Sequence, residues 1–235
     1  MSAGSKDQTE VPNVPWPDIV RFVRQLSHDI RNHLNASELQ SAYLAELTQD
    51  EELQSEIQRL REMLGEIGAS FQRLTTGLGQ INPTFMQYRA ADFLEDVQQK
   101  VAKDFPESSS KIRWEINVGE AGLEIDPQLL QQAFLELFRN AFQNDGKNGI
   151  EAKAGVEGER LIFKLREPKT KFERSTERWG QEPLREVGQG RYGLGLNRVR
   201  LIVEAHGGEF RAEFNRPESV LVTTVALPTS HEKNA

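Results

Sequence analysis

The chain has 235 residues, enough for one large domain or two small ones with a substantial core. Its formal net charge of -7 argues against a nucleic-acid backbone or an anionic membrane surface as its main partner. The absence of cysteine excludes disulfides and thiolate metal sites, and four scattered histidines disfavour a zinc site. Because the sequence has neither an apolar run of ~20 residues nor a signal-peptide core, we expect a cytoplasmic protein without a membrane span.

The first predicted helix follows a polar, proline-rich segment. Residues 1–17 contain three prolines, so we expect a disordered lead-in that forms no helix. A helix is predicted over residues 19–47 with Asp18 as its cap, followed by a turn at 48–50. Apolar side chains recur in it at intervals of three and four, which places them on one face: Val23, Leu26, Ile30 and Leu34.

His28 lies on the opposite face of this helix. It is two positions from both Leu26 and Ile30, or roughly 200° of helical turn, so we expect its imidazole to face water. Asp29 follows it directly, and Asn32 lies one turn further on. The pattern has two interpretations: a surface histidine on a polar helix face, or a nucleophile or proton carrier beside a carboxylate and a carboxamide.

A second helix carries the most regular apolar pattern in the chain. Its positions alternate steps of four and three, as in a heptad seam: Leu53, Ile57, Leu60, Leu64, Ile67, Phe71, Leu74 and Leu78. The two helices form an antiparallel hairpin over residues 18–80, and one hairpin cannot cover so long a seam. We therefore predict a homodimer in which two hairpins form a four-helix bundle. The alternative is a coiled-coil dimerisation element without chemistry.

The pattern changes to α/β after Gly77, Gly79 and Pro83, and we predict a second domain over residues 85–228. Asp126 and Pro127 signal a helix start. The predicted helices cover 90–103, 127–143 and 194–205, and the predicted strands cover 112–118, 149–156, 160–166, 209–214 and 219–227. The polar stretch 168–191 is long for a loop and indicates a lid, a binding loop or disorder. Residues 229–235 are predicted to be a frayed tail.

Motifs in both domains resemble the sensor histidine kinases. SHDIRNHLN, around His28, is similar to their phosphoacceptor motif. The stretch LLQQAFLELFRNA, the triplet Glu182-Pro183-Leu184 and GRYGLGLNRVRLIVEAHGGEF resemble, in this order, motifs of their ATP-binding domain, which is shared with the gyrase, Hsp90 and MutL superfamily. The resemblance implies α + α/β architecture: a dimerising helical hairpin followed by an α/β sandwich of the histidine kinase and Hsp90 ATPase type.

The resemblance also implies a Mg²⁺ and ATP site in the second domain. Asn140 is at the position of the family's magnesium-binding residue, and an amide oxygen is a hard ligand that suits Mg²⁺. Gly193 and Gly195 belong to a glycine-rich helix start, which can present N–H groups to phosphates. Glu136 is either the general base of ATP hydrolysis, as in the Hsp90-like branch, or a solvated helix residue. Counting back from Glu182 places Glu167 where the family has the aspartate that binds the adenine amino group.

Several positions depart from the family pattern. Lys169 and Lys171 stand where the first glycine box has glycines, so positive φ is lost and bulk is added near the pocket. Gln143 stands where a basic residue is common. The other departures are Arg191-Tyr192 in place of Gly-Thr and His33 in place of Pro. The phosphoacceptor half therefore matches the family better than the nucleotide half.

The predicted function is two-component signalling. His28 would be autophosphorylated from Mg-ATP and would pass the phosphoryl group to a response-regulator receiver domain. Asp29 would orient the ring, Asn32 would position a water or the receiver's aspartate, and Arg24 or Arg31 would supply positive charge. One alternative is a phosphotransferase or pseudokinase that binds no ATP and relays phosphate or docks receiver domains. Another is a dimeric scaffold without catalysis.

Overall fold

The computed structural model describes residues 14–143, 149–169, 172, 176, 179–181, 183, 187–188 and 191–230. Contacts within the chain divide it into two compact units, Met1–Leu78 and Gly79–Ala235. The first unit is helical and the second is α/β, which confirms the predicted fold class. The predicted lead-in lies outside the described residues as far as residue 13.

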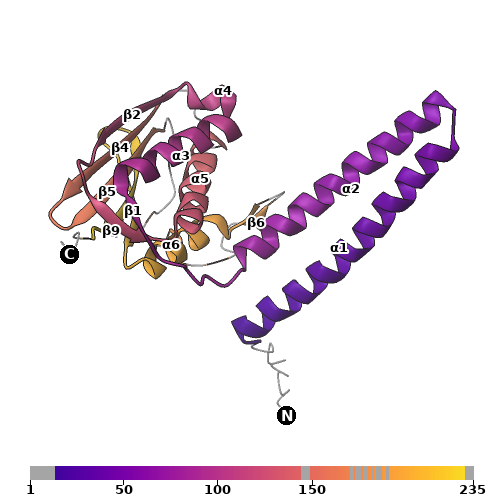
Figure 1. The fold of residues 1–235 in the computed structure, drawn as a ribbon, viewed down its shortest axis with the longest axis horizontal. Helices are drawn as coiled ribbons and strands as arrows, with labels where there is room; N and C mark the ends of the chain where they lie inside the picture. The colour runs from indigo at the N-terminus through magenta and orange to yellow at the C-terminus, as the bar shows by residue number, and fades with distance from the viewer. Residues whose placement is uncertain are drawn as a thin grey trace, which may run out of the picture. The chain divides into compact units, whose positions relative to one another are not determined.

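Helix α1 (Trp16–Leu47) begins earlier than predicted (Figure 1). The expectation that the prolines prevent a helix up to residue 17 is wrong, because Pro17 sits in the first turn of α1. A proline is tolerated there since the N–H that it lacks has no partner within the helix. The prediction that Asp18 caps the helix is also wrong: Asp18 lies inside the first turn and forms an ion pair with Arg21 at 3.3 Å.

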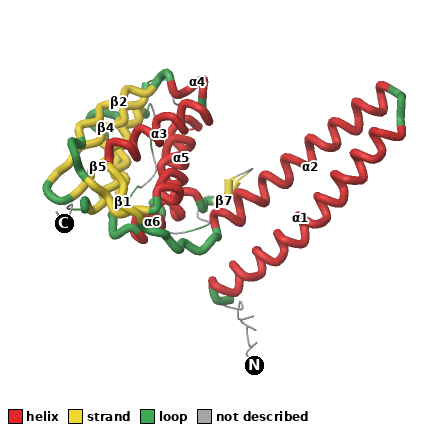
Figure 2. The backbone as a smooth tube through the Cα atoms, viewed as in Figure 1, coloured by secondary structure: helices red, strands yellow, loops and turns green. Residues whose placement is uncertain are grey.

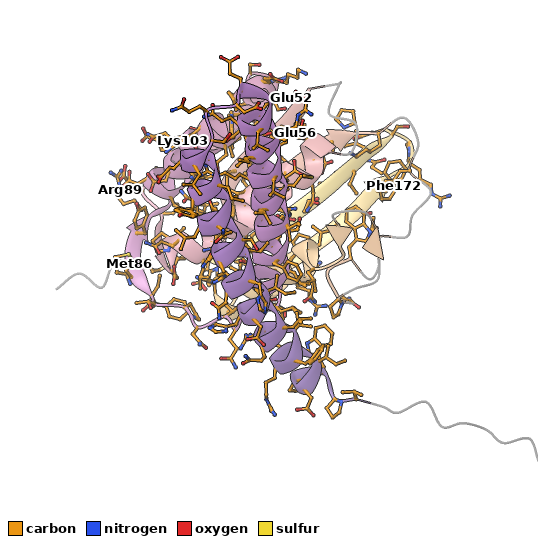
Figure 3. All side chains as sticks on the ribbon, turned by 90° about the vertical axis from the view of Figure 1, so that its right-hand side faces the viewer. Glu52, Glu56, Met86, Arg89, Lys103 and Phe172 are labelled. Atoms are coloured by element: carbon orange, nitrogen blue, oxygen red, sulfur yellow. The ribbon has the colours of Figure 1, made fainter. Side chains whose placement is uncertain are left out.

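Helix α2 (Glu51–Gly77) has the side-chain cap that α1 lacks. Asp50 accepts hydrogen bonds from the backbone N–H groups of Glu52, at 2.9 Å, and Leu53, at 3.2 Å. Glu52 and Glu56 follow one turn apart (Figure 3), and Glu56 pairs with Arg59 at 2.7 Å. Carboxylates in the first turn of α2 also interact favourably with the positive N-terminal end of the helix dipole. Together with the Asp50 cap they stabilise the start of α2 directly after the turn that follows α1.

The hairpin packs small and apolar side chains between its two helices. Ser27 and Ser41 of α1 and Ile57 of α2 are buried, and Leu34 Cδ1 lies 3.7 Å from the place that a Cβ on Gly68 would occupy. Many other apolar side chains of the hairpin stay exposed: Phe22, Leu26, Leu39, Tyr43, Leu44, Leu47, Leu53, Leu60, Met63 and Ile67. A single hairpin thus leaves much of its apolar surface uncovered.

The second unit is a five-stranded sheet with helices on one face (Figures 1 and 2). Its strand order is β2-β4-β5-β9-β8; β2 and β4 are parallel and the other pairs antiparallel. The sheet strands are β2 (Ile112–Asn117), β4 (Ile150–Glu157), β5 (Arg160–Pro168), β8 (Glu209–Asn215) and β9 (Val220–Pro228). The helices are α3 (Ala90–Asp104), α4 (Pro106–Ser109), α5 (Pro127–Gln143) and α6 (Gly195–Ala205).

The core lies between the sheet and helices α3, α5 and α6. Phe134 of α5 is fully buried, with its ring centroid 5.3 Å from that of Phe93 on α3 and 4.8 Å from that of Phe163 on β5. Burying each such side chain contributes about 1.5–3 kcal/mol. Along β5 the buried side chains alternate with half-buried ones, and the last of the buried set is Glu167.

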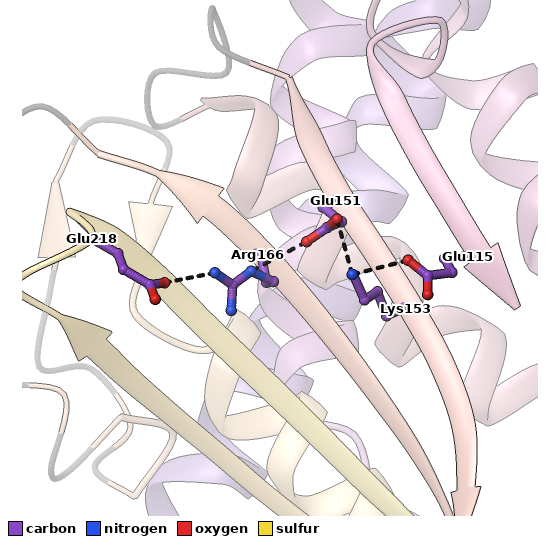
Figure 4. A network of polar contacts seen from close by, with 5 residues as sticks. All are labelled: Glu115, Glu151, Lys153, Arg166 and Glu218. Atoms are coloured by element: carbon purple, nitrogen blue, oxygen red, sulfur yellow. Dashed lines mark hydrogen bonds and ion pairs between the residues drawn. The ribbon is translucent and has the colours of Figure 1, made fainter.

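The opposite face of the sheet carries a ladder of charges (Figure 4). Lys153 of β4 contacts Glu115 at 2.9 Å and Glu151 at 3.2 Å. Arg166 of β5 contacts Glu151 at 3.2 Å and Glu218 at 2.7 Å. The pairs of Lys153 with Glu115 and of Arg166 with Glu151 join adjacent strands, which is a favourable cross-strand arrangement.

Two short sheets were not predicted from the sequence. Strand β1 (Met86–Arg89) pairs with β3 (Gly122–Ile125), and β6 (Val187–Gly188) pairs with β7 (Arg191–Tyr192) inside the predicted 168–191 loop. The tail is held further than expected: Ser230 N–H donates to Gly122 O at 2.8 Å. Residues 231–235 lie outside the described part of the chain.

Described residues of the 168–191 stretch form an aromatic cluster. Phe172 (Figure 3) has its ring centroid 4.7 Å from that of Phe214 on β8 and 5.6 Å from that of Trp179. Asn197 of α6 donates to Gly180 O at 2.8 Å. The stretch is therefore attached at one point to the edge strand and at another to the first turns of α6.

Candidate functional site

His28 is exposed on α1, as its position in the helix predicted, with 68% of its side chain accessible. Its Nδ1 lies 3.3 Å from Asp29 Oδ1 and 3.4 Å from Asn32 Nδ2. Gln25 donates to the same Asp29 oxygen at 2.9 Å, which fixes the carboxylate beside the ring. The structure therefore brings together the three residues that the sequence nominated for the phosphoacceptor site.

These contacts favour one tautomer of His28. A carboxylate accepts hydrogen bonds only, so its contact with Nδ1 places the proton on Nδ1. A 180° rotation of the Asn32 amide group exchanges its oxygen and nitrogen, and the oxygen can then accept a hydrogen bond from the same Nδ1 proton. Both described contacts involve Nδ1, and most of the side chain is accessible, so with the proton on Nδ1 the Nε2 atom keeps its lone pair. A nucleophile needs this arrangement.

The described contacts of Arg24 and Arg31 are with the second helix of the hairpin and the residue that follows it, rather than with the imidazole. Arg24 donates to Leu78 O at 3.0 Å, and Arg31 donates to Gln72 Oε1 at 2.6 Å. Both guanidinium groups cross from α1 to α2 and stabilise the hairpin.

Helix α5 is anchored at its N-terminus by a set of hydrogen bonds around Asp126. The carboxylate accepts from the N–H of Leu129 at 3.0 Å and of Thr84 at 2.9 Å. The Asp126 N–H donates to His206 Nε2 at 3.0 Å, and the opposite ring nitrogen lies 2.7 Å from Ile202 O. Buried His206 therefore ties the end of α6 to the start of α5 through both of its ring nitrogens.

Replacing Asp126 with alanine is expected to lower the free energy of unfolding by about 1–2 kcal/mol at neutral pH, as loss of a helix cap does. Burial raises the pKa of this carboxyl, but hydrogen bonds from backbone N–H groups outweigh it and hold the pKa below its ordinary value of 3.8. The stabilisation is present above pH 3.8 and is lost as the pH falls through the folded value. Denaturant titrations at several pH values measure this; a cost that does not change with pH would contradict it.

Glu136, Asn140 and Gly195 meet where α5 packs against the start of α6. Asn140 Nδ2 donates to Glu136 Oε1 at 3.4 Å. A Cβ on Gly195 would overlap the Glu136 carboxylate, with Cδ only 2.9 Å away, so a larger residue here would displace the Glu136 side chain from its present position. Gly193 has φ of 61°, a left-handed conformation that glycine adopts at low cost and that turns the chain into α6. Four of the five predicted nucleotide-site residues thus lie around one helix start.

Glu167, the fifth, is buried at the end of β5 in an ion pair. Its Oε2 lies 2.9 Å from Lys169 Nζ, and the two side chains are only 8% and 7% accessible. Burial raises the pKa of Glu167, and the Lys169 ammonium opposes that rise. The carboxylate that was predicted to bind the adenine base is therefore already paired with Lys169, the lysine that replaces a glycine of the family pattern.

Other predicted departures fall on parts of the chain that the structure does not describe. Lys171 and Glu182 lie outside the described residues, as does Leu184 of the Glu182-Pro183-Leu184 motif. The backbones of Gln143, Arg191 and Tyr192 belong to α5 and β7, but their side chains are outside the description.

Arg139 and Arg198 were not selected in the sequence analysis. Arg139 forms an ion pair with Glu136 one turn earlier on α5. Arg198 of α6 donates to Gly79 O at 3.3 Å and to Gln132 Oε1 at 3.4 Å, and burial lowers its pKa. The spacing of Glu136 and Arg139 is a common helical pair and could have been noticed. The contacts of Arg198 are with residues far away in the sequence, so no local sequence pattern predicts them.

Comparison with solved structures identifies the fold. ShkA, solved at full length in complex with AMPPNP, matches 89% of this chain with a TM-score of 0.69 and 19% identity. ThkA, solved in complex with the response regulator TrrA, matches 91% with a TM-score of 0.57 and 19% identity. AdeS, a histidine kinase of Acinetobacter baumannii, matches 86% with a TM-score of 0.54 and 16% identity. No family model matches the chain, and no curated protein matches it in sequence.

The chain has the histidine-kinase fold, a helical hairpin followed by an α/β domain of the ATP-binding type, as its motifs predicted. It spans 46% of ShkA, 63% of ThkA and 96% of the solved AdeS chain. Among the described residues, no helix is both long and apolar enough to cross a membrane.

Proposed function

We propose that this protein acts in two-component signal transduction, with His28 as the residue that carries the phosphoryl group. In this proposal His28 is phosphorylated from Mg-ATP and passes the group to an aspartate of a response regulator in the cytoplasm. The observation that carries the proposal is the exposed imidazole of His28, whose Nδ1 lies beside Asp29 and Asn32. The solved complex of ThkA with TrrA, a response regulator, supports the choice of partner.

Phosphoryl transfer would take place at Nε2 of His28. Its lone pair attacks the γ-phosphorus of ATP, an N–P bond forms, the P–O bond to the β-phosphate breaks, and ADP leaves. The ring becomes cationic, and Asp29 stabilises that charge through Nδ1–H. In the second step the N–P bond breaks, an O–P bond forms on the regulator's aspartate, and the neutral ring is restored. Asn32 would orient that aspartate or a water.

The residues of the second unit fit a magnesium nucleotide in their chemistry. Asn140 and Glu136 offer an amide and a carboxylate beside the start of α6, and Mg²⁺ is commonly held by one or two such protein oxygens with phosphate and water completing its shell. The described residues contain no cluster of three or more His, Cys, Asp or Glu side chains that could bind a metal ion by themselves. Asn140 would hold the ion, Gly193 and Gly195 would admit the phosphates, and Glu167 would face the base. When bound, Mg²⁺ neutralises phosphate charge.

Titration with Mg-ATP in a calorimeter is expected to show micromolar binding that Asn140→Ala removes. The physical reason is that removal of the amide oxygen removes a ligand of the ion. Asn32→Ala, in the hairpin, is the matched control and should leave binding unchanged. Absence of heat up to millimolar ATP, where even ~4 kcal/mol of binding is detected, would overturn ATP as the donor.

The hairpin is proposed to dimerise. Its uncovered apolar side chains on α2, Leu60 and Ile67 among them, support a four-helix bundle formed by two copies. Replacing both by glutamate is expected to convert the dimer to a monomer in analytical ultracentrifugation, because two charges per chain would be buried without partners. Replacing the exposed Glu56 and Glu62 by glutamine serves as the control. A mutant that sediments as the wild type does would contradict this arrangement.

A second candidate function is phosphorelay without ATP. The buried Glu167–Lys169 pair favours it, because the adenine base of ATP would have to compete with the Lys169 ammonium for the Glu167 carboxylate. In that case His28 would receive its phosphoryl group from the aspartyl phosphate of one receiver domain and deliver it to another. Phosphorylated receiver, offered in the absence of ATP, tests this route directly through label on His28.

A further inference from the structure

We propose that Arg139 is a phosphate-binding residue of the nucleotide site, held in place by Glu136 until the nucleotide arrives. This inference rests on the proposed function, since it concerns the same site. It starts from the ion pair between Arg139 Nη1 and Glu136 Oε2 on α5. It assigns a role to a side chain that the sequence motifs left unused.

The position of Glu136 creates a charge problem at this site. Its other carboxylate oxygen lies against Gly195, the first residue of α6, where the N–H groups of a helix start attract anions. A carboxylate at that place repels a polyphosphate, so the site needs a counter-charge besides the metal ion. Arg139 already supplies one to Glu136, which is 24% accessible while the Arg139 side chain is 44% accessible.

The two arginines of α6 whose contacts are described are directed elsewhere, and Arg200 pairs with Glu204 at 2.6 Å. Arg198 reaches Gly79 O and Gln132 Oε1. Gln143, four residues after Arg139 and so on the same stripe of α5, carries no charge. Arg139 is the one basic residue of α5, and its pair with Glu136 keeps its charge beside the carboxylate that lies against Gly195.

A guanidinium group can serve both partners. It has five N–H donors in a planar fork that matches carboxylate and phosphate oxygens. The contact with Glu136 uses Nη1, and the fork can engage a second anion through its remaining donors. Glu136 thus keeps the flexible Arg139 side chain close to the start of α6 before a ligand binds. This reduces the conformational entropy that the Arg139 side chain loses when a phosphate binds.

A double-mutant cycle separates phosphate binding from simple neutralisation of Glu136. We would measure Mg-ATP binding by calorimetry for the wild-type protein, Arg139→Gln, Glu136→Gln and the double variant, with thermal melts to verify folding. The expected result is that Arg139→Gln weakens binding at least tenfold in both backgrounds, and that Arg139→Lys recovers part of the loss. Arg113→Gln, on the exposed face of β2, is the matched control and should bind as the wild type does.

Each outcome has a distinct meaning. If Arg139→Gln has no effect in the Glu136→Gln background, Arg139 only neutralises Glu136 and the proposed phosphate contact is overturned, while the kinase function stands. If it has no effect in either background, the residue lies outside the site. If the folded wild-type protein binds no Mg-ATP, the proposed donor fails, and the role of Arg139 falls with it.

Discussion

Replacing His28 with glutamine is expected to reduce phosphorylation of the protein to the background level. Glutamine keeps a polar side chain of similar reach on the exposed face of α1, so the hairpin should fold unchanged, but it has no nucleophilic ring nitrogen. Transfer of labelled phosphoryl group from Mg-ATP, or from a phosphorylated receiver domain, measures the effect. The label should be labile in acid and stable in alkali, as a phosphoramidate is.

His33 provides the matched control. It is a second exposed histidine on α1, five residues further on, and no acid follows it directly. His33→Gln should retain the wild-type level of label. If label persists in His28→Gln and disappears in His33→Gln, the wrong histidine has been assigned. If neither variant changes signalling in cells, the protein is a scaffold.

Replacing Lys169 with methionine is expected to lower the free energy of unfolding by about 3–5 kcal/mol, because removal of one partner leaves a buried charge uncompensated. Glu167 and Lys169 are both nearly inaccessible, so water cannot replace the lost partner. Denaturant unfolding followed by circular dichroism measures the change. Lys153→Met, on the exposed charge ladder of Figure 4, is the matched control and should have a far smaller effect.

The double variant Glu167→Gln with Lys169→Met should recover most of that loss. Replacing a whole buried pair by neutral groups is often neutral, or stabilising by about 1–4 kcal/mol. The pKa of Glu167 is raised by burial, so the stability that its protonated form contributes is present below its ordinary pKa of 4.5 and is lost as the pH rises through the folded value. In the Lys169→Met variant this loss of stability with rising pH should become steeper. Equal stability of the single and double variants would contradict the account.

The sequence predicted those parts of the fold that depend on local patterns. Helix α2 follows from apolar steps of three and four, and the start of α5 follows from Asp126 and Pro127, whose cap the structure contains. His28 was placed on the exposed face by periodicity alone, and the structure agrees. In each of these cases one helix determines the outcome, so no tertiary information was needed.

Features set by distant contacts could not be predicted. Strands β1 and β3 have four residues each and exist because they pair with one another, at a separation too great for a turn signal. Arg24 and Arg31 appeared to surround His28 on a helical wheel, yet both extend to α2. The Glu167–Lys169 pair needed the strand register to show that both side chains are buried. The motif order nevertheless indicated the correct fold at an identity below 20%.

The most direct test of the central claim is phosphorus–nitrogen correlation NMR on isotope-labelled protein after incubation with Mg-ATP or a phosphorylated receiver domain. This measurement identifies both the residue and the ring nitrogen that carry the phosphoryl group. The account predicts one phosphohistidine, at His28, with phosphorus bonded to Nε2, because Nδ1 is engaged by Asp29 and Asn32. Phosphorus on Nδ1, on another residue or on no histidine at all would contradict it.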